Sequence, residues 1–116
     1  MVRKLQKTRR VVSIDTRQRD AMSLIRRLVE TDTSRINFSA HALERMDERG
    51  IVARDVYRTL QIGEPYGGVE RGKNEEEIKL TISFQPRGMR EIAVVTVSVI
   101  EGERVLVKTV MWRDEK

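Results

Sequence analysis

Apolar residues in the first third of the chain recur at helical spacing. In the segment TRQRDAMSLIRRLVE they stand three or four residues apart with charged residues between them. This spacing is typical of an amphipathic helix and predicts one over residues 17–30. Its predicted buried stripe comprises Ala21, Leu24, Ile25 and Leu28.

Two shorter helices are predicted next, in the segments SAHALERMDERG and ARDVYRTLQIG. Ser39 is a suitable N-cap for the first, and Gly50 stands where a left-handed residue would end it. The second, over residues 53–62, ends at Gly63, with a proline just beyond. The apolar positions expected to be buried are Ala42, Leu43, Met46, Val56 and Leu60.

From residue 77 onward the period changes to two. EIKLTISF alternates apolar with polar residues, and EIAVVTVSVI and RVLVKTVMW follow as β-branched runs joined by tight turns. Successive hairpins of this kind form an antiparallel meander. PYGGVE supplies a candidate edge strand. The pattern predicts an α+β domain with N-terminal helices packed on one face of a three- or four-stranded antiparallel meander.

Composition limits the chemistry. The 116 residues contain no cysteine and one histidine, which excludes disulfides, thiolate catalysis and the usual zinc sites. We therefore expect neither a metal nor another cofactor. No run of about 18 apolar residues occurs, so we expect a cytoplasmic protein that does not enter the membrane.

The positive charge is concentrated at the N-terminus. Residues 1–37 hold ten Lys/Arg and four Asp/Glu, whereas residues 38–116 hold 13 and 14. We divide the chain into a basic arm, residues 1–16, and one domain, residues 17–116. The arm either binds a polyanion or is a solvated leader. The candidate nucleic-acid contacts are Arg3, Lys4, Lys7, Arg9, Arg10, Arg26 and Arg27.

The only histidine lies on a charged stripe of the second predicted helix. His41, Arg45, Glu48 and Arg49 are spaced i, i+4, i+7 and i+8, so they share one face. Metal-free phosphodiester cleavage needs a base, an acid and cations beside the phosphate, and these side chains could supply them. The alternative is structural: the arginines pair with nearby carboxylates, and His41 bonds locally.

A catalytic groove would also need side chains from the sheet. Lys79, Lys108 and Thr109 are the candidates by residue type. Strict alternation sends Lys108 and Thr109 to opposite faces, so both can reach one groove only if a β-bulge intervenes.

The segment INFSAHALERMDERGIVARDVYRTLQIGE resembles the opening of the bacterial domain of unknown function 4258. The matching pattern is Ser-x-His-Ala, Arg-Met and Arg-Gly-Ile, followed by a short helix that ends in glycine. The resemblance covers about residues 36–112, with Lys79 at a position that is often basic and Thr109 in the closing strand. It implies a RelE-like fold and similarity to the RelE and BrnT toxins, small ribonucleases neutralised by an antitoxin. The catalytic candidates are then His41, Arg45, Arg49, Lys79 and Thr109.

Three classes of function follow from the sequence. The first is a toxin-type, metal-independent endoribonuclease or RNA-binding protein, with RNA and a cognate antitoxin as partners. The second is a non-catalytic nucleic-acid-binding regulator. The third is a phage- or plasmid-borne module that inhibits another protein. The five aromatic residues are too dispersed for a base-stacking platform, and the choice between a monomer and a homodimer stays open.

Overall fold

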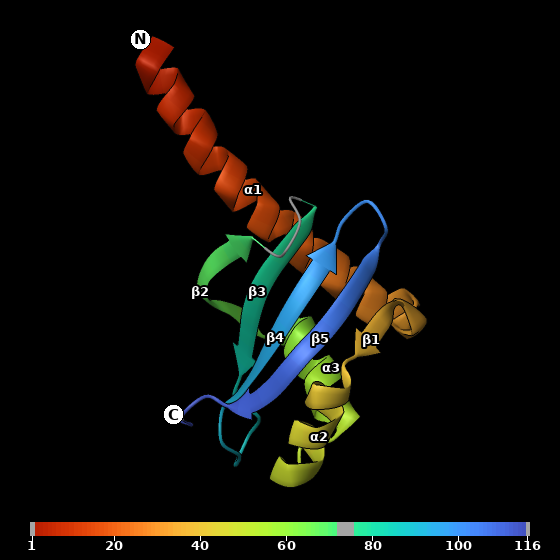
Figure 1. Cartoon of the computed structure of the whole chain (residues 1–116). Coiled ribbons are helices and arrows are strands. Elements are labelled where there is room, and N and C mark those ends of the chain that lie inside the picture. The colour runs from red at the N-terminus through yellow and green to blue at the C-terminus, as the bar shows by residue number, and fades with distance from the viewer. Residues whose placement is uncertain (1, 72–75, 116) are drawn as a thin grey trace.

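The computed structural model describes the backbone of residues 2–71 and 76–115, and the side chains of residues 16–68 and 76–115 (Figure 1). Helices come first along the chain, and the meander follows. The elements are α1 (Val2–Thr31), the 3₁₀ turn η1 (Thr33–Arg35), β1 (Ile36–Phe38), α2 (Ala40–Arg49), α3 (Ala53–Ile62), β2 (Glu64–Arg71), β3 (Glu77–Phe84), β4 (Ile92–Val99) and β5 (Arg104–Trp112).

The strands form one sheet in the order β1-β5-β4-β3-β2. Strands β2 to β5 are the expected antiparallel meander, and PYGGVE lies within β2. The prediction of three or four strands was too low, because β1 adds a fifth strand parallel to β5. With only three residues, β1 is too short to show alternation in the sequence. The α+β class is confirmed, with a mixed sheet.

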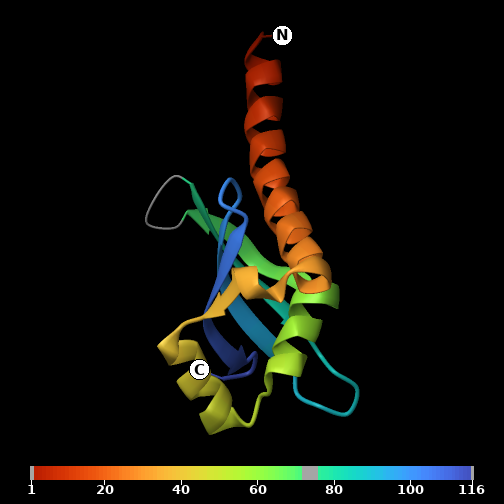
Figure 2. The ribbon, with the colours of Figure 1, turned by 90° about the vertical axis from the view of Figure 1, so that its right-hand side faces the viewer.

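Helices α1 and α3 cover one face of this sheet, and α2 lies beside β5 at its edge (Figures 1 and 2). Ile78, Leu80 and Ile82 of β3 point at the helices and are at most 5% exposed. Their partners on β4 are Ser98, Thr96 and Val94, all fully buried, and the facing residues of β5 are buried with them. The other face of the sheet, here called the open face, is covered by none of the described helices.

The stripe predicted for α1 is confirmed, because Ala21, Leu24, Ile25 and Leu28 are all buried. Helix α1 itself, however, is longer than predicted: it begins at Val2, and its first half projects beyond the sheet (Figure 2). Residues 2–16 have no apolar stripe of their own, so periodicity could not reveal this extension. The arm side chains Arg3, Lys4, Lys7, Arg9 and Arg10 lie outside the side chains that the structure describes.

The two short helices match their predicted limits. Ala42 and Met46 are buried, and Gly50 ends α2 in the left-handed conformation, with φ 68°. Leu43 is a correction, since 53% of it is exposed. At the edge of the sheet α2 buries only a narrow i, i+4 stripe. Gly63 ends α3 as expected. None of the described helices is long and apolar enough to cross a membrane.

Candidate functional site

The start of α2 is attached directly to β5. The backbone N–H of Ser39 donates to the carbonyl of Val107 at 3.0 Å, and the Ser39 hydroxyl donates to the carbonyl of Lys108 at 2.8 Å. The same hydroxyl oxygen accepts from the N–H of Ala42 at 3.0 Å, which caps the helix. One serine therefore fixes the first turn of α2 against the middle of β5.

A β-bulge lies at this point of β5. Val95 pairs with Thr109, whereas the next residue of β4, Thr96, pairs with Val107, so Lys108 is the extra residue. Burial agrees with this register: Val107 and Val110 are buried, while Lys108 is exposed and Thr109 is half-buried. The bulge that the sequence left open is present, and it directs Lys108 and Thr109 away from the core together.

The catalytic candidates Lys79 and Thr109 lie on the same side of the sheet. Lys79 pairs with Val97, and Thr109 pairs with Val95. These partners are two residues apart on β4, so Lys79 and Thr109 both point to the open face, with one strand between them. Strands two apart in a sheet are separated by about 10 Å. A short extended ligand could contact both side chains.

His41 lies in the first turn of α2, two residues after the cap that binds β5. Its side chain is exposed and makes no hydrogen bond or ion pair with any described residue. The N-terminus of a helix also carries the positive end of the helix dipole. The Ser39 hydroxyl holds this first turn beside the backbone of Lys108; Lys108, Thr109 and the first turn of α2 are here called the bulge site.

The two arginines of the α2 stripe are engaged elsewhere. Arg45 pairs with Glu48 at 2.7 Å, one turn along the helix. Arg49 reaches the C-terminal segment, where its Nε and Nη2 donate to the two carboxylate oxygens of Glu115, both at 2.5 Å. The arrangement corresponds to the structural alternative, with Glu115 as a partner that the sequence did not indicate.

This contact alters the acidity of Glu115. The bidentate hydrogen bond from Arg49, followed by the N–H of Trp112, lowers the pKa of Glu115 from 4.5 to about 2. Glu115 in turn raises the pKa of Arg49. Both side chains are about three-quarters buried. The pair holds the end of the chain against α2 and stays charged over the whole physiological range.

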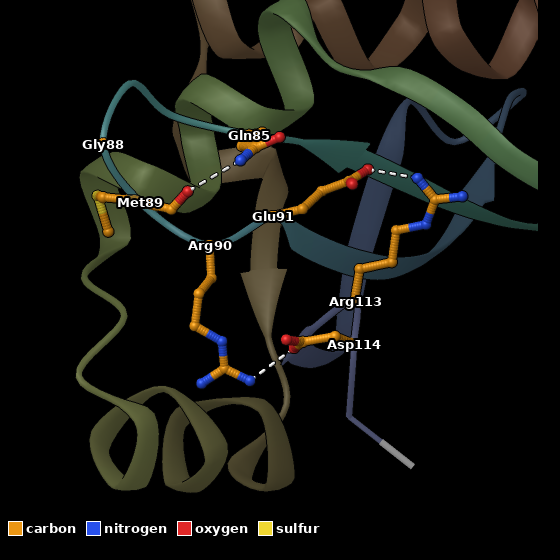
Figure 3. Close-up of a pocket in the computed structure, with 7 residues that line it drawn as sticks. All are labelled: Gln85, Gly88, Met89, Arg90, Glu91, Arg113 and Asp114. Carbon is orange, nitrogen blue, oxygen red and sulfur yellow. Dashed lines mark hydrogen bonds and ion pairs between the residues drawn. The ribbon is translucent and has the colours of Figure 1, made fainter.

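A pocket opens between the β3–β4 loop and the residues after β5 (Figure 3). Two arginines line it, with side chains that point in opposite directions, and each has a carboxylate partner: Arg90 pairs with Asp114 at 2.5 Å, and Arg113 pairs with Glu91 at 2.7 Å. No local sequence signal marks these residues, because they are far apart along the chain and meet only when β4 and β5 pair. The pocket is lined by Gln85, Gly88, Met89, Arg90, Glu91, Arg113 and Asp114.

The guanidinium groups of this pocket rest on aromatic rings. Arg90 lies 4.9 Å from the ring centre of Trp112, and Arg113 lies 4.2 Å from that of Tyr66. Glu91, and then Tyr66, raise the pKa of Arg113. Stacking together with a fixed ion pair limits how each planar guanidinium can turn.

The two described arginines among the nucleic-acid candidates make contacts within the domain. Arg26 is half-buried and donates to the carbonyl of Gly63 at 3.0 Å, and Arg27 pairs with Glu103 at 2.6 Å. Arg26 thus joins α1 to the end of α3. The Arg27 pair is about half exposed, so it does not prevent contact with a ligand.

Comparison with known proteins identifies one family. A search of curated proteins and a search of solved structures each found no match. A family model described as Domain of unknown function (DUF4258) matches residues 38–112, from the last residue of β1 through the end of β5. The matched region includes the start of α2, the bulge in β5 and the open face, and leaves α1 outside. The chain therefore belongs to the DUF4258 family.

Proposed function

We propose that this protein binds RNA on the open face of its sheet, as a member of the RelE/BrnT toxin type. The observation that carries the proposal is the bulge, because it points Lys108 and Thr109 to one side, next to the first turn of α2. A lysine, a hydroxyl group and the positive end of a helix suit a phosphate group. Lys79 extends this polar surface across the open face.

Contacts with the RNA backbone fit this surface better than base stacking does. The central positions of the open face are aliphatic, with Val95 and Val97 on β4 and Leu106 and Met111 on β5. Tyr66, the aromatic residue of this face, is already covered by Arg113. We therefore expect affinity to depend on salt more than on sequence, as it does when phosphates dominate binding.

Binding is tested with short single-stranded RNAs and three alanine variants. Lys108→Ala and Lys79→Ala should each weaken binding, and each should make the plot of log K against log salt less steep by about 0.7. Arg54→Ala is the matched control, because Arg54 is an exposed cation on α3, on the far side of the sheet. Equal losses in all three variants would mean that the charge acts without a defined site.

Cleavage of the bound RNA is a second candidate function, and the position of His41 favours it. An exposed imidazole in the first turn of α2 could take the proton of a 2′-hydroxyl, whose oxygen attacks the phosphorus while Lys108 stabilises the phosphorane. The bond between phosphorus and the 5′-oxygen then breaks, and the 5′-oxygen takes a proton from the imidazolium or from water. His41→Ala should then lower the cleavage rate by about 10² to 10⁴ and leave RNA affinity unchanged. Because the two arginines are engaged in ion pairs, we expect Arg49→Ala to act mainly through stability.

The outcome of the cleavage assay separates the two candidates. If the wild-type protein binds RNA tightly but does not cut it, the ribonuclease proposal is refuted and RNA binding remains as the function. Cleavage that persists in His41→Ala would exclude His41 as the base. Failure of the wild-type protein to bind any RNA would contradict both candidates and favour a protein partner.

A further inference from the structure

The pocket at the end of the sheet has a specific pattern of donors and acceptors. Arg113 and Glu91 lie side by side, joined at 2.7 Å, and both face the same space (Figure 3). One Nη of Arg113 binds Glu91, and a guanidinium carries five N–H donors, so others remain for a ligand. The pocket thus presents hydrogen-bond donors directly beside a carboxylate, which only accepts.

Guanine is the nucleobase whose edge fits this pattern best. It presents two acceptors, O6 and N7, next to two donor groups, N1–H and the N2 amine. Arginine is the usual partner of O6 and N7, and a carboxylate accepts from N1–H and N2–H. Cytosine offers one amine as its donor, so it would satisfy Glu91 through one bond. Adenine has no acceptor at C6, and uracil has a single donor.

We propose that this pocket is a subsite for a guanine nucleotide, in which Arg113 donates to O6 and N7 and Glu91 accepts from N1 and N2. The proposal rests on the proposed RNA-binding function and deepens it, because it adds a base preference to a surface that otherwise contacts the RNA backbone.

The side chains of the subsite are held in place before any ligand binds. The ring of Tyr66 lies under Arg113, and Glu91 is 29% exposed, the least of the four charged side chains in the pocket. Recognition by fixed groups loses less conformational entropy than recognition by free surface side chains.

The subsite is continuous with the open face. Arg113 follows Thr109 by four residues, which is about 13 Å along an extended strand, and its side chain lies against Tyr66 of β2. One short RNA could therefore place a phosphate at the bulge site and a guanine in the pocket. The two sites would then act as one binding surface with a single sequence-reading position.

The test uses fluorescence anisotropy with RNA hexamers that differ at one position. The hexamers carry guanosine, inosine, 7-deazaguanosine or cytidine there; inosine lacks the N2 amine, and 7-deazaguanosine lacks N7. Wild-type protein should bind the guanosine hexamer about fivefold or more tightly than each of the others. Because these changes are made in the RNA, the comparison does not depend on whether a variant folds.

Protein variants then assign the preference to the pocket. Glu91→Ala should bring the ratio of guanosine to inosine affinity close to one, and Glu44→Ala, an exposed carboxylate on α2, should leave it unchanged. Thermal melting confirms that both variants are folded. Equal affinity of the wild type for the guanosine, inosine and 7-deazaguanosine hexamers would overturn the guanine subsite while leaving RNA binding intact.

Free nucleotides distinguish the source of the guanine. Displacement of the hexamer by GMP, but not by AMP, supports a pocket that reads the base without the rest of the strand. Preference for guanosine in the hexamer without displacement by GMP supports a pocket that works only within RNA. If the protein binds no RNA, the proposed function fails, and direct titration with GMP and AMP tests the pocket by itself; equal binding of the two, or none, would overturn it.

Discussion

Removing the carboxylate of Glu115 should loosen the contact that holds the C-terminal segment against α2. Arg49 donates to both carboxylate oxygens of Glu115 at 2.5 Å, and the two side chains are 22% and 25% exposed. Hydrogen bonds to charged groups contribute about 1.5 to 3 kcal/mol each when they are well shielded from water. We therefore expect Glu115→Gln to lower the free energy of unfolding measurably at neutral pH.

The pKa gives an upper limit for this effect. The difference between 4.5 and about 2 for Glu115, converted at about 1.36 kcal/mol per pH unit, sets a ceiling of about 3 kcal/mol. A quarter of the side chain is exposed, and solvent screening lowers the contribution. We expect a loss of about 1 to 2 kcal/mol at pH 7.

The same pKa fixes the direction of the pH dependence. A carboxylate whose pKa is lower in the folded than in the unfolded chain stabilises the fold while it is ionised. For Glu115 this stabilisation is fully present above the unfolded value of 4.5 and is lost as the pH falls toward about 2. The difference in stability between wild type and Glu115→Gln should therefore be large at pH 7 and small at pH 2.5.

A double-mutant cycle in urea isolates the pair. Arg49→Met, Glu115→Gln and the double variant are unfolded at pH 7, with circular dichroism as the signal. We predict a coupling energy of about 1 kcal/mol or more, and Glu44→Gln on α2 serves as the control. Coupling below about 0.3 kcal/mol would refute the structural role of Arg49 and return it to the catalytic candidates.

Three further predictions concern the glycines and the arm. Gly63→Ala should cost about 2 kcal/mol or more, because a Cβ there would lie 2.4 and 2.6 Å from two backbone carbonyl oxygens; Gly68→Ala, with open space around it, should leave the melting temperature unchanged. Gly50→Ala should cost about 1 to 2 kcal/mol through left-handed strain alone, and an unchanged melting temperature would contradict this reading. Deleting residues 1–15, which hold five Lys/Arg, should make the plot of log K for RNA against log salt less steep by about 3.5; an unchanged slope would mean that the arm does not contact the RNA.

Local signals in the sequence predicted most of the fold. Period-two alternation located β3 to β5, and the Ser39 cap and Gly50 stop marked both ends of α2. Two elements were not predicted. One forms only through a tertiary contact, and the other has no periodic apolar pattern. The strand β1 forms by pairing with β5, and the first half of α1 continues a packed helix without a stripe of its own.

The candidate site was predictable in residue type but not in partners. The stripe that begins at His41 suggested one catalytic group, yet the structure separates it: His41 is exposed, and Arg49 is bound to Glu115. A charged residue near the end of a chain gives no local signal of the helix it will contact. The bulge at Lys108 could not be predicted from the sequence, because the register of β4 against β5 decides it.

Valine methyl groups can report directly whether RNA lies on the open face. Val95 and Val97 of β4 point to the open face, where Val95 is half-buried and Val97 is 8% exposed, whereas Val94 on the same strand is fully buried under the helices. In NMR spectra of methyl-labelled protein titrated with a short RNA, we predict shifts for Val95, smaller shifts for Val97 and little change for Val94. Shifts at Val94 alone, or none on β4 while the RNA is bound, would contradict it.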